Sequence, residues 1–206
     1  INNMTLSKTP QEIFWSEKIG QSYLEKNLFE PTERALTRTQ FFDLFRSFDL
    51  NAKILECGCN NGTNLAILKE MGFNNLHGIE IFKGAVEEAK TNIPSATITE
   101  GTMLNLPYKD KEFDIVFTCG VLIHQHPQNS LPIALNEIYR VSKSNILGYE
   151  NYSPTHTSKG NYRGETDRYW WGPFHEIIQN QFPSIVLTSN FITNYKASWI
   201  NYSFQK

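Results

Sequence analysis

The chain has little of what marks a membrane-spanning, disulfide-bonded or nucleic-acid-binding protein. Nowhere in its 206 residues does an apolar run approach the roughly 18 residues that span a bilayer. The three cysteines are an odd number, and the pair Cys57-x-Cys59 has no second pair to complete a zinc site, so we expect reduced thiols and no metal. Nineteen basic and 21 acidic residues give a net charge of −2, without the basic footprint of polyanion binding. We therefore expect neither a membrane nor a nucleic-acid partner.

What is present is the composition of one soluble globular domain, with 40% hydrophobic and 13% aromatic residues. The opening residues, 1–11, lack the basic and apolar regions of a signal peptide. This predicts a cytoplasmic protein.

Short β-rich runs alternate with amphipathic segments through the centre of the chain, which is typical of βαβ units and a mostly parallel sheet. The sequence predicts strands at about 53–57, 76–81, 96–100, 113–119 and 145–150, with helices following the first, second and fourth. Two helices, at residues 10–30 and 32–48, are expected before the sheet. A helix at 173–182 and two antiparallel strands at 185–191 and 197–204 are expected to complete the chain.

A ligand-binding turn is predicted after the first strand. Glu56 lies near the end of that strand, and the turn Gly58–Gly62 leads into a helix, an arrangement that binds ligands at the carboxyl end of a parallel strand. A dinucleotide fingerprint would need glycine at positions 60 and 63, where the chain has Asn60 and Thr63, so a nicotinamide oxidoreductase is disfavoured. Because Asn tolerates positive φ, Asn60 can hold the turn.

This segment resembles motif I of the class I S-adenosylmethionine-dependent methyltransferases. The resemblance implies S-adenosylmethionine as cofactor and gives cofactor contacts to Glu56, Gly58, Cys59 and Asn60. The fold it implies is a single α/β Rossmann-like methyltransferase domain with a seven-stranded, mostly parallel sheet and an antiparallel last strand. Residues 1–50 would form an N-terminal helical cap within the same domain, and 51–206 the cofactor-binding part.

Further cofactor contacts follow from the next strand. Glu80 stands about twenty residues beyond Gly58 at the predicted end of the second strand, where a carboxylate can accept both ribose hydroxyls. Ile81 follows it and is expected beside the cofactor.

The adenine end of the cofactor is expected after the third strand. The family often has an acid there, and Thr102 stands at that position in this chain, with Met103 placed to cover the adenine face. Matching the fourth strand to the family puts Cys119 and Gly120 beside the ligand.

Motifs outside the cofactor half are similar to those of the small methylases associated with pseudaminic acid biosynthesis clusters. These motifs are Phe14-Trp15 with Gly20, Tyr23 and Asn27, then Gly120–His124, Glu150–Thr155 and Tyr162–Gly164. Lys26 stands where the pattern has Arg. The resemblance implies that Trp15 and Tyr23 face the cofactor and acceptor, although an aromatic pair such as Phe14-Trp15 is also typical of a core.

Four residues are candidates for the acceptor side and catalysis: His124, Tyr152, His156 and Arg163. His124 is a candidate proton acceptor, and a hydrogen-bonded core histidine is the alternative. Residues 152–172 are polar and aromatic without periodicity, which favours a lid loop over the acceptor. A solvated surface loop is the alternative for that segment.

The sequence thus predicts an enzyme that transfers a methyl group to an oxygen or nitrogen of a small polar acceptor, such as a sugar or surface-polysaccharide precursor. The alternative is a non-catalytic cofactor- or ligand-binding protein on the same fold, which Asn60 and Thr102 favour. The acceptor and the oligomeric state stay open at this point.

Overall fold

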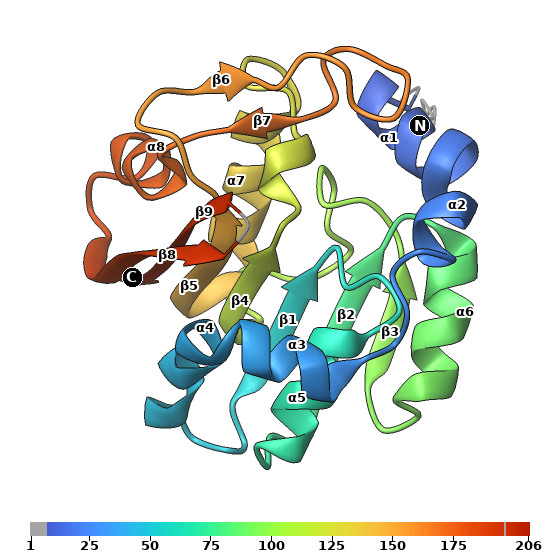
Figure 1. Cartoon of the computed structure of the whole chain (residues 1–206). Coiled ribbons are helices and arrows are strands. Elements are labelled where there is room, and N and C mark those ends of the chain that lie inside the picture. The colour runs from blue at the N-terminus through green and yellow to red at the C-terminus, as the bar shows by residue number, and fades with distance from the viewer. Residues whose placement is uncertain (1–7, 196) are drawn as a thin grey trace, which may run out of the picture.

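A seven-stranded sheet forms the centre of the computed structural model, which describes residues 8–195 and 197–206 (Figure 1). The strand order is β3-β2-β1-β4-β5-β9-β8. Five strands run parallel to one another: β1 (Lys53–Cys57), β2 (Asn75–Glu80), β3 (Thr97–Glu100), β4 (Phe113–Cys119) and β5 (Ser142–Asn151). β9 (Ala197–Gln205) pairs antiparallel to β5, and β8 (Val186–Tyr195) antiparallel to β9. The predicted fold class is confirmed, including the antiparallel last strand.

Helices cover both faces of the sheet because its central strands are apolar on both sides. Ile54 and Leu55 of β1 point to opposite faces, and each is 0% exposed. On the Ile54 face lie α4 (Thr39–Asp43), α5 (Thr63–Glu70) and α6 (Lys83–Asn92). On the Leu55 face lie α7 (Ser130–Val141) and α8 (Phe174–Gln181). Within the described ranges, no helix is both long and apolar enough to cross a membrane.

The first predicted helix is present in three consecutive parts. They are α1 (Pro10–Ile13), a π-helix (Phe14–Ile19) and α2 (Gly20–Leu24). α1 begins with a capping box, in which the Thr9 hydroxyl accepts from the Glu12 amide and the Glu12 carboxylate accepts from the Thr9 amide. The predicted cap extends back into residues 1–7, which lie outside the described residues.

The second predicted helix is also divided. α3 (Pro31–Thr37) packs on α5 and is separated from α4 by Arg38, whose φ of −126° leaves the helical range. A short 3-10 turn (Leu44–Ser47) follows α4. Charged and apolar residues continue the helical pattern through the break, so the pattern alone did not reveal it.

Residues 152–172, which we call the flap, are more ordered than a plain loop. They contain β6 (Thr157–Ser158) and β7 (Trp170–Trp171), which pair antiparallel to each other. Two-residue strands are too short to show alternation, so the sequence did not predict them. In Figure 1 the flap lies above the upper ends of the central strands, beside α1.

Candidate functional site

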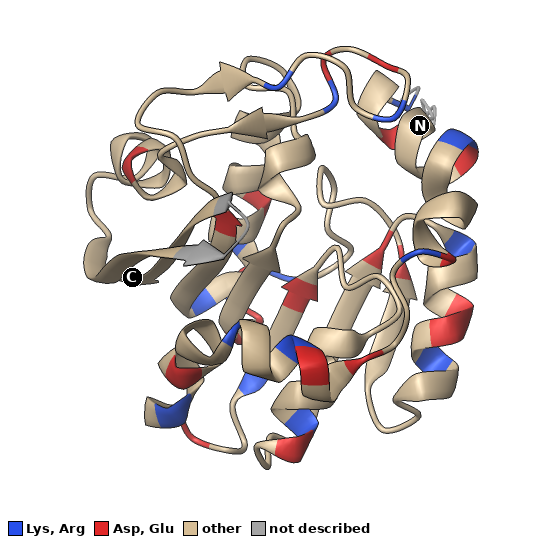
Figure 2. Ribbon diagram, in the orientation of Figure 1, with Lys and Arg blue, Asp and Glu red and all other residues tan. Residues whose placement is uncertain are grey.

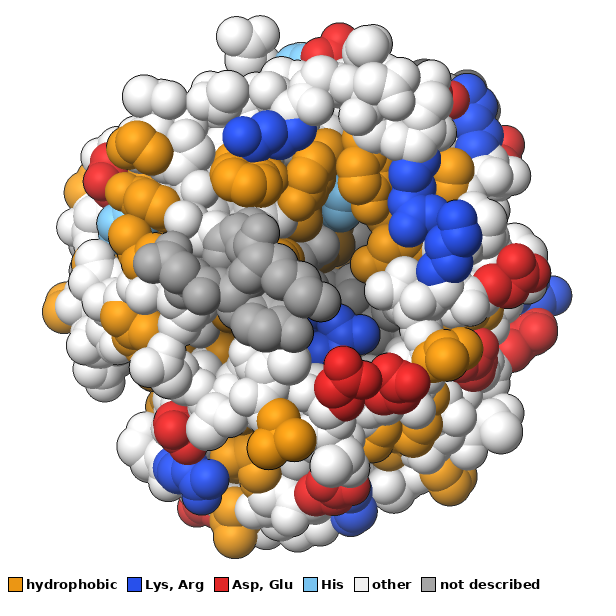
Figure 3. Space-filling view, in the orientation of Figure 1, with side chains coloured by type: hydrophobic (Ala, Val, Ile, Leu, Met, Phe, Trp, Pro, Cys, Tyr) orange, Lys and Arg blue, Asp and Glu red, His pale blue; other side chains and the backbone are white. Residues whose placement is uncertain are grey.

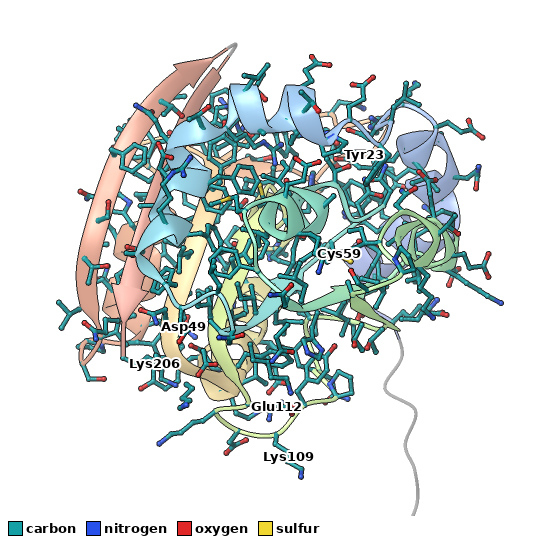
Figure 4. The ribbon with its side chains drawn as sticks, turned by 90° about the horizontal axis from the view of Figure 1, so that it is seen from below. Tyr23, Asp49, Cys59, Lys109, Glu112 and Lys206 are labelled. Atoms are coloured by element: carbon teal, nitrogen blue, oxygen red, sulfur yellow. The ribbon has the colours of Figure 1, made fainter. Side chains whose placement is uncertain are left out.

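A cavity of about 140 Å³ opens at the carboxyl ends of β1, β2 and β4. α2 forms one wall through Tyr23, and the turn after β1 forms another through Cys59; both residues are labelled in Figure 4. Figure 3 shows this face hollowed, with hydrophobic, basic, acidic and histidine side chains around the hollow. The sequence-predicted residues that line the cavity are Trp15, Tyr23, Gly58, Cys59, Asn60, Glu80, Ile81, Thr102, Met103, Cys119, Gly120 and His124.

Left-handed backbone positions shape the turn after β1. Gly58, Asn60 and Gly62 have φ of 74°, 46° and 84°. Asn60 therefore takes the conformation that its place in the motif requires. A Cβ on Gly58 would lie 2.6 Å from the Cγ2 atom of Val121, so glycine lets two cavity-lining segments approach closely.

Three backbone amides hold the Glu80 carboxylate against this turn. Asn60 donates to Oε2 at 2.9 Å, and Ile81 and Phe82 donate to Oε1 at 2.8 and 3.0 Å. Burial raises the pKa of Glu80, and these three hydrogen bonds oppose that rise. The carboxylate is thus fixed at the cavity wall with lone-pair capacity left on Oε2.

Glu56 lies beneath the cavity and does not line it. Its Oε1 accepts from the Asn64 amide at 2.6 Å, whereas Oε2 has no hydrogen-bond partner among the described residues. Burial raises the pKa of Glu56 to about 8, although Asn64 and the charge of Arg38 favour the ionised form. The carboxyl therefore holds a proton at neutral pH. Figure 2 shows acidic residues toward the upper ends of central strands.

Two arginines that were not predicted from the sequence line the cavity. Arg34 and Arg38 lie four residues apart, which puts them on one side of α3 and its end. Arg38 contacts the Cys119 thiol, and its Nη1 lies 3.4 Å from Asn64 Oδ1. Burial and the neighbouring charge of Arg38 lower the pKa of Arg34. The four-residue spacing was the available signal, but it is equally typical of a solvated helix face.

His124 lines the cavity as a neutral ring. Its Nδ1 lies 2.9 Å from the Arg168 carbonyl oxygen, which can only accept, so Nδ1 carries the hydrogen and Nε2 keeps its lone pair. Burial lowers the pKa of His124 to about 4. The ring packs 4.5 Å from that of Trp15 and stacks 5.3 Å from that of Tyr169. His124 is therefore both a packed histidine and a cavity residue.

The other acceptor-side candidates lie in different places. Arg163 is not among the lining residues, but its guanidinium lies over the ring of Tyr23, which is, at 5.1 Å from the ring centroid. Tyr152 and His156 are not among the lining residues. The Tyr152 ring lies 6.3 Å from that of His175, and the His156 ring 5.7 Å from that of Phe174, so both are near α8.

Glu150 is a second buried acid, and no role was predicted for it from the sequence. Its carboxylate accepts from the amides of Val121, Leu122 and Ile123 at 3.2 to 3.4 Å. Burial raises its pKa to about 7, against the effect of these hydrogen bonds. Glu150 thereby fixes the segment that carries Val121 and His124 into the cavity wall.

The cysteines are free thiols, as expected. Burial raises the pKa of Cys119, beside the cavity, to about 12, so it is no thiolate nucleophile. Among the residues that the structure describes, no cluster of three or more His, Cys, Asp or Glu side chains is placed to hold a metal ion.

Comparisons with known proteins agree with this fold. Residues 55–146 match a family model described as a methyltransferase domain. An uncharacterized methyltransferase of Synechocystis sp. is 31% identical over 91 residues, which are 44% of this chain and 42% of that protein. An uncharacterized protein of Haemophilus influenzae is 30% identical over 107 residues, 48% of this chain and 42% of that protein. The chain thus spans less than half the length of these curated relatives.

Solved structures extend the likeness to nearly the whole chain. Magnesium protoporphyrin IX methyltransferase from Synechocystis, with bound S-adenosylhomocysteine, superposes with a TM-score of 0.69 at 14% identity, over 95% of this chain and 97% of that one. The [4+2]-cyclase SpnF superposes with a TM-score of 0.62 at 13% identity, over 85% and 81%. At these identities the likeness is one of fold.

Proposed function

We propose that the chain is an S-adenosylmethionine-dependent methyltransferase that acts on an oxygen or nitrogen of a small polar acceptor. One observation carries the proposal: a carboxylate held by three amides and two arginines line one cavity, and a buried carboxyl with a free oxygen lies beneath it. This set is complementary to an amino acid joined to a ribose. Glu80 suits the ribose hydroxyls, Glu56 the ammonium group, and Arg34 and Arg38 the carboxylate.

The spacing of these groups fits the shape of the methionine portion. The ammonium and carboxylate of an amino acid share one carbon, so a ligand whose ammonium reaches Glu56 must place its carboxylate close by. Arg38 lies there, since Asn64 contacts both Arg38 and Glu56. The open turn at Gly58 lets the ligand pass against the backbone.

The adenine end is less polar. Thr102 and Met103 line the cavity, and the Thr102 hydroxyl oxygen accepts from the Leu104 amide at 3.2 Å. Its O–H is left to donate to a ring nitrogen of adenine. The acid that the family often has here is thus replaced by a neutral donor.

When bound, S-adenosylmethionine supplies an electrophilic methyl group on a sulfonium sulfur. The chain's own residues then position the acceptor for in-line attack, in which the bond from acceptor to methyl carbon forms as the carbon–sulfur bond breaks. His124 Nε2 can accept a hydrogen bond from an acceptor hydroxyl. With a pKa of about 4, it orients that hydroxyl better than it deprotonates it.

The acceptor side favours a sugar or surface-polysaccharide precursor. Trp15, His124, Tyr162 and Tyr169 form a cluster of ring contacts between the π-helix and the flap, suited to packing on carbon faces of a polyhydroxylated ligand. The resemblance to methylases of pseudaminic acid clusters supports the same class. Tyr152 and His156 carry no role in this proposal. A cytoplasmic location stays a prediction.

A non-catalytic or differently acting protein on this fold is the second candidate. The likeness to SpnF, a [4+2]-cyclase by its description, favours it, because it separates the fold from methyl transfer. Formation of S-adenosylhomocysteine with any sugar or sugar-acid acceptor would decide against this candidate.

Calorimetric titration with S-adenosylhomocysteine tests the proposed function directly. We expect one site per chain, weakened by Glu80→Gln and unchanged by Glu87→Gln, an exposed acid on α6 that does not line the cavity. Failure of the folded wild-type protein to bind would overturn the proposal.

A further inference from the structure

Arg163 differs from the arginines that are paired with acids. Arg46, Arg140 and Arg168 each form an ion pair with a carboxylate within 4.0 Å. No such pair is found for Arg163 among the described residues. Its guanidinium instead lies over the Tyr23 ring, at 5.1 Å, and 5.7 Å from the centroid of the Tyr162 ring. Arg163 is exposed and does not itself line the cavity, but its guanidinium lies on the ring of Tyr23, which does.

The backbone at Arg163 is in a conformation that long side chains seldom adopt. Tyr162 and Glu165 exchange both backbone hydrogen bonds, at 2.7 and 3.2 Å, around a two-residue turn. The two central residues, Arg163 and Gly164, have φ of 51° and 92°. Asn, Asp and Gly are the residues favoured at the first of these positions. The chain thus has an arginine where a shorter residue would form the turn more readily, which points to a use for the side chain.

Contacts with the N-terminal helices fix the direction of this turn. Glu165 forms an ion pair with Lys18 of the π-helix, and the Gln11 side chain donates to the Asp167 carbonyl at 3.3 Å. Both contacts are made by residues that follow the turn's central residues, Arg163 and Gly164. The guanidinium is therefore aimed at Tyr23, which lines the cavity.

Positive charge exceeds what the cofactor can neutralise. Arg34 and Arg38 also lack ion pairs within the described part of the chain, and the charges of all three arginines act on the Tyr23 phenol. The cofactor has one carboxylate, which Arg34 and Arg38 would share, together with a cationic ammonium and sulfonium.

The acidic residues around the cavity do not neutralise this excess of positive charge. Glu80 is engaged by three amides and Glu56 faces the cofactor ammonium. Glu12 caps α1, and Glu30 and Glu33 are exposed beside each other at the outer end of α3. None of these five is ion-paired with Arg163.

We propose that the acceptor carries an oxyanion, a carboxylate or a phosphate, and that Arg163 binds it while the group to be methylated lies at His124. This inference rests on the proposed function and narrows its acceptor to an acidic small molecule. Arg163 and His124 interact electrostatically, because the positive charge of Arg163 is one cause of the lowered pKa of His124. A bound oxyanion offsets that charge, so the acceptor itself improves His124 as a proton acceptor.

Inorganic phosphate is the probe, titrated by calorimetry into protein saturated with S-adenosylhomocysteine at constant ionic strength. Arg163→Asn removes the cation and suits the left-handed turn, so it should fold at least as well as the wild type. Arg46→Asn is the matched control, with the same exchange at an exposed position before β1. We expect phosphate to bind the wild type and the control equally, and Arg163→Asn about tenfold more weakly.

Competition of galacturonate and galactose with bound phosphate distinguishes a carboxylate from a phosphate as the oxyanion. Displacement of phosphate by galacturonate and not by galactose indicates a carboxylate site. Phosphate binding that galacturonate leaves unchanged indicates a phosphate site, and either result supports the inference. Binding of S-adenosylhomocysteine without phosphate binding, or equal phosphate affinity in Arg163→Asn, overturns the inference alone. Loss of S-adenosylhomocysteine binding in the wild type overturns the proposed function instead.

Discussion

Replacing Glu56 by Gln should stabilise the empty protein at alkaline pH. The Glu56 side chain is 0% exposed, and its pKa is raised from 4.5 to about 8, chiefly by burial. Between these values the folded protein keeps a proton that the unfolded chain has lost, so the free energy of unfolding falls as pH rises from 4.5 to 8. The pKa difference, from 4.5 to about 8, sets an upper limit of about 5 kcal/mol on that loss.

The Glu56→Gln variant keeps the size and packing of the side chain at position 56 and removes its titratable carboxyl. Its amide oxygen can still accept from Asn64, as Oε1 does now at 2.6 Å. The free energy of unfolding of the variant, relative to that of the wild type, should be several kcal/mol higher at pH 8.5 than at pH 5, within the limit above. Urea unfolding at the two pH values measures this difference. Glu150, whose pKa is about 7, titrates in both proteins and cancels in the comparison.

The same substitution should change the protons exchanged on cofactor binding. A carboxyl with a pKa of about 8 is roughly 0.9 protonated at pH 7. An ammonium arriving at Oε2 would displace that proton, so S-adenosylhomocysteine binding should release about 0.9 proton. Calorimetry in two buffers of different ionisation enthalpy measures this number. Equal release by the wild type and Glu56→Gln would refute the assignment of Glu56 to the ammonium group. A stability difference that does not change with pH would refute the raised pKa of Glu56 in the empty protein.

Four further outcomes are expected. Glu80→Ala should weaken S-adenosylhomocysteine binding by about 1.5 to 3 kcal/mol, measured by calorimetry, and unchanged affinity would remove Glu80 from the site. Gly58→Val should abolish S-adenosylhomocysteine binding and also lower the melting temperature. A Cβ at this position would lie 2.6 Å from Val121, and the φ of 74° strains a β-branched residue. An unchanged melting temperature would contradict the close approach of these two segments. Because the pKa of His124 is lowered from 6.5 to about 4, stability should fall by up to about 3 kcal/mol as pH drops from 6.5 to 4, and His124→Gln should lack this fall in acid unfolding curves. Amides of the flap, residues 152–172, should gain hydrogen-exchange protection with S-adenosylhomocysteine and acceptor present, and uniformly fast exchange would leave it a plain surface loop.

The sequence predicted the sheet because each central strand is a short apolar run between clear turn residues. Phe113–Cys119, for example, lies between a charged turn and Gly120 and is β4 in the structure. The turn at Gly58–Gly62 was equally readable, since its conformation depends on local residues whose φ preferences are known.

The rest of the site depends on contacts between distant segments. The spacing of Arg34 and Arg38 is typical of a solvated helix face, and only the position of α3 beside the cavity shows that they line it. The role of Glu150 depends on how β5 aligns with the segment after β4, which no local pattern specifies. Tyr152 and His156 belong to an aromatic, polar segment whose path could not be read from composition, and the structure places them near α8.

The extent of the matched segment has a consequence for how new activities arise on this fold. Residues 55–146 supply the floor of the cavity, with the turn after β1, Glu80 and His124. Further lining residues, such as Gln11, Tyr23 and Arg38, come from the helices that precede that segment, and the flap, which follows it, is joined to those helices by Lys18 and Glu165. Substitutions, insertions and deletions in the N-terminal helices or in the flap lie outside the segment that supplies the floor. Under the proposed function, the acceptor specificity can therefore change between relatives while cofactor binding is retained, and a change at Lys18 or Glu165 selects for a compensating change at the other.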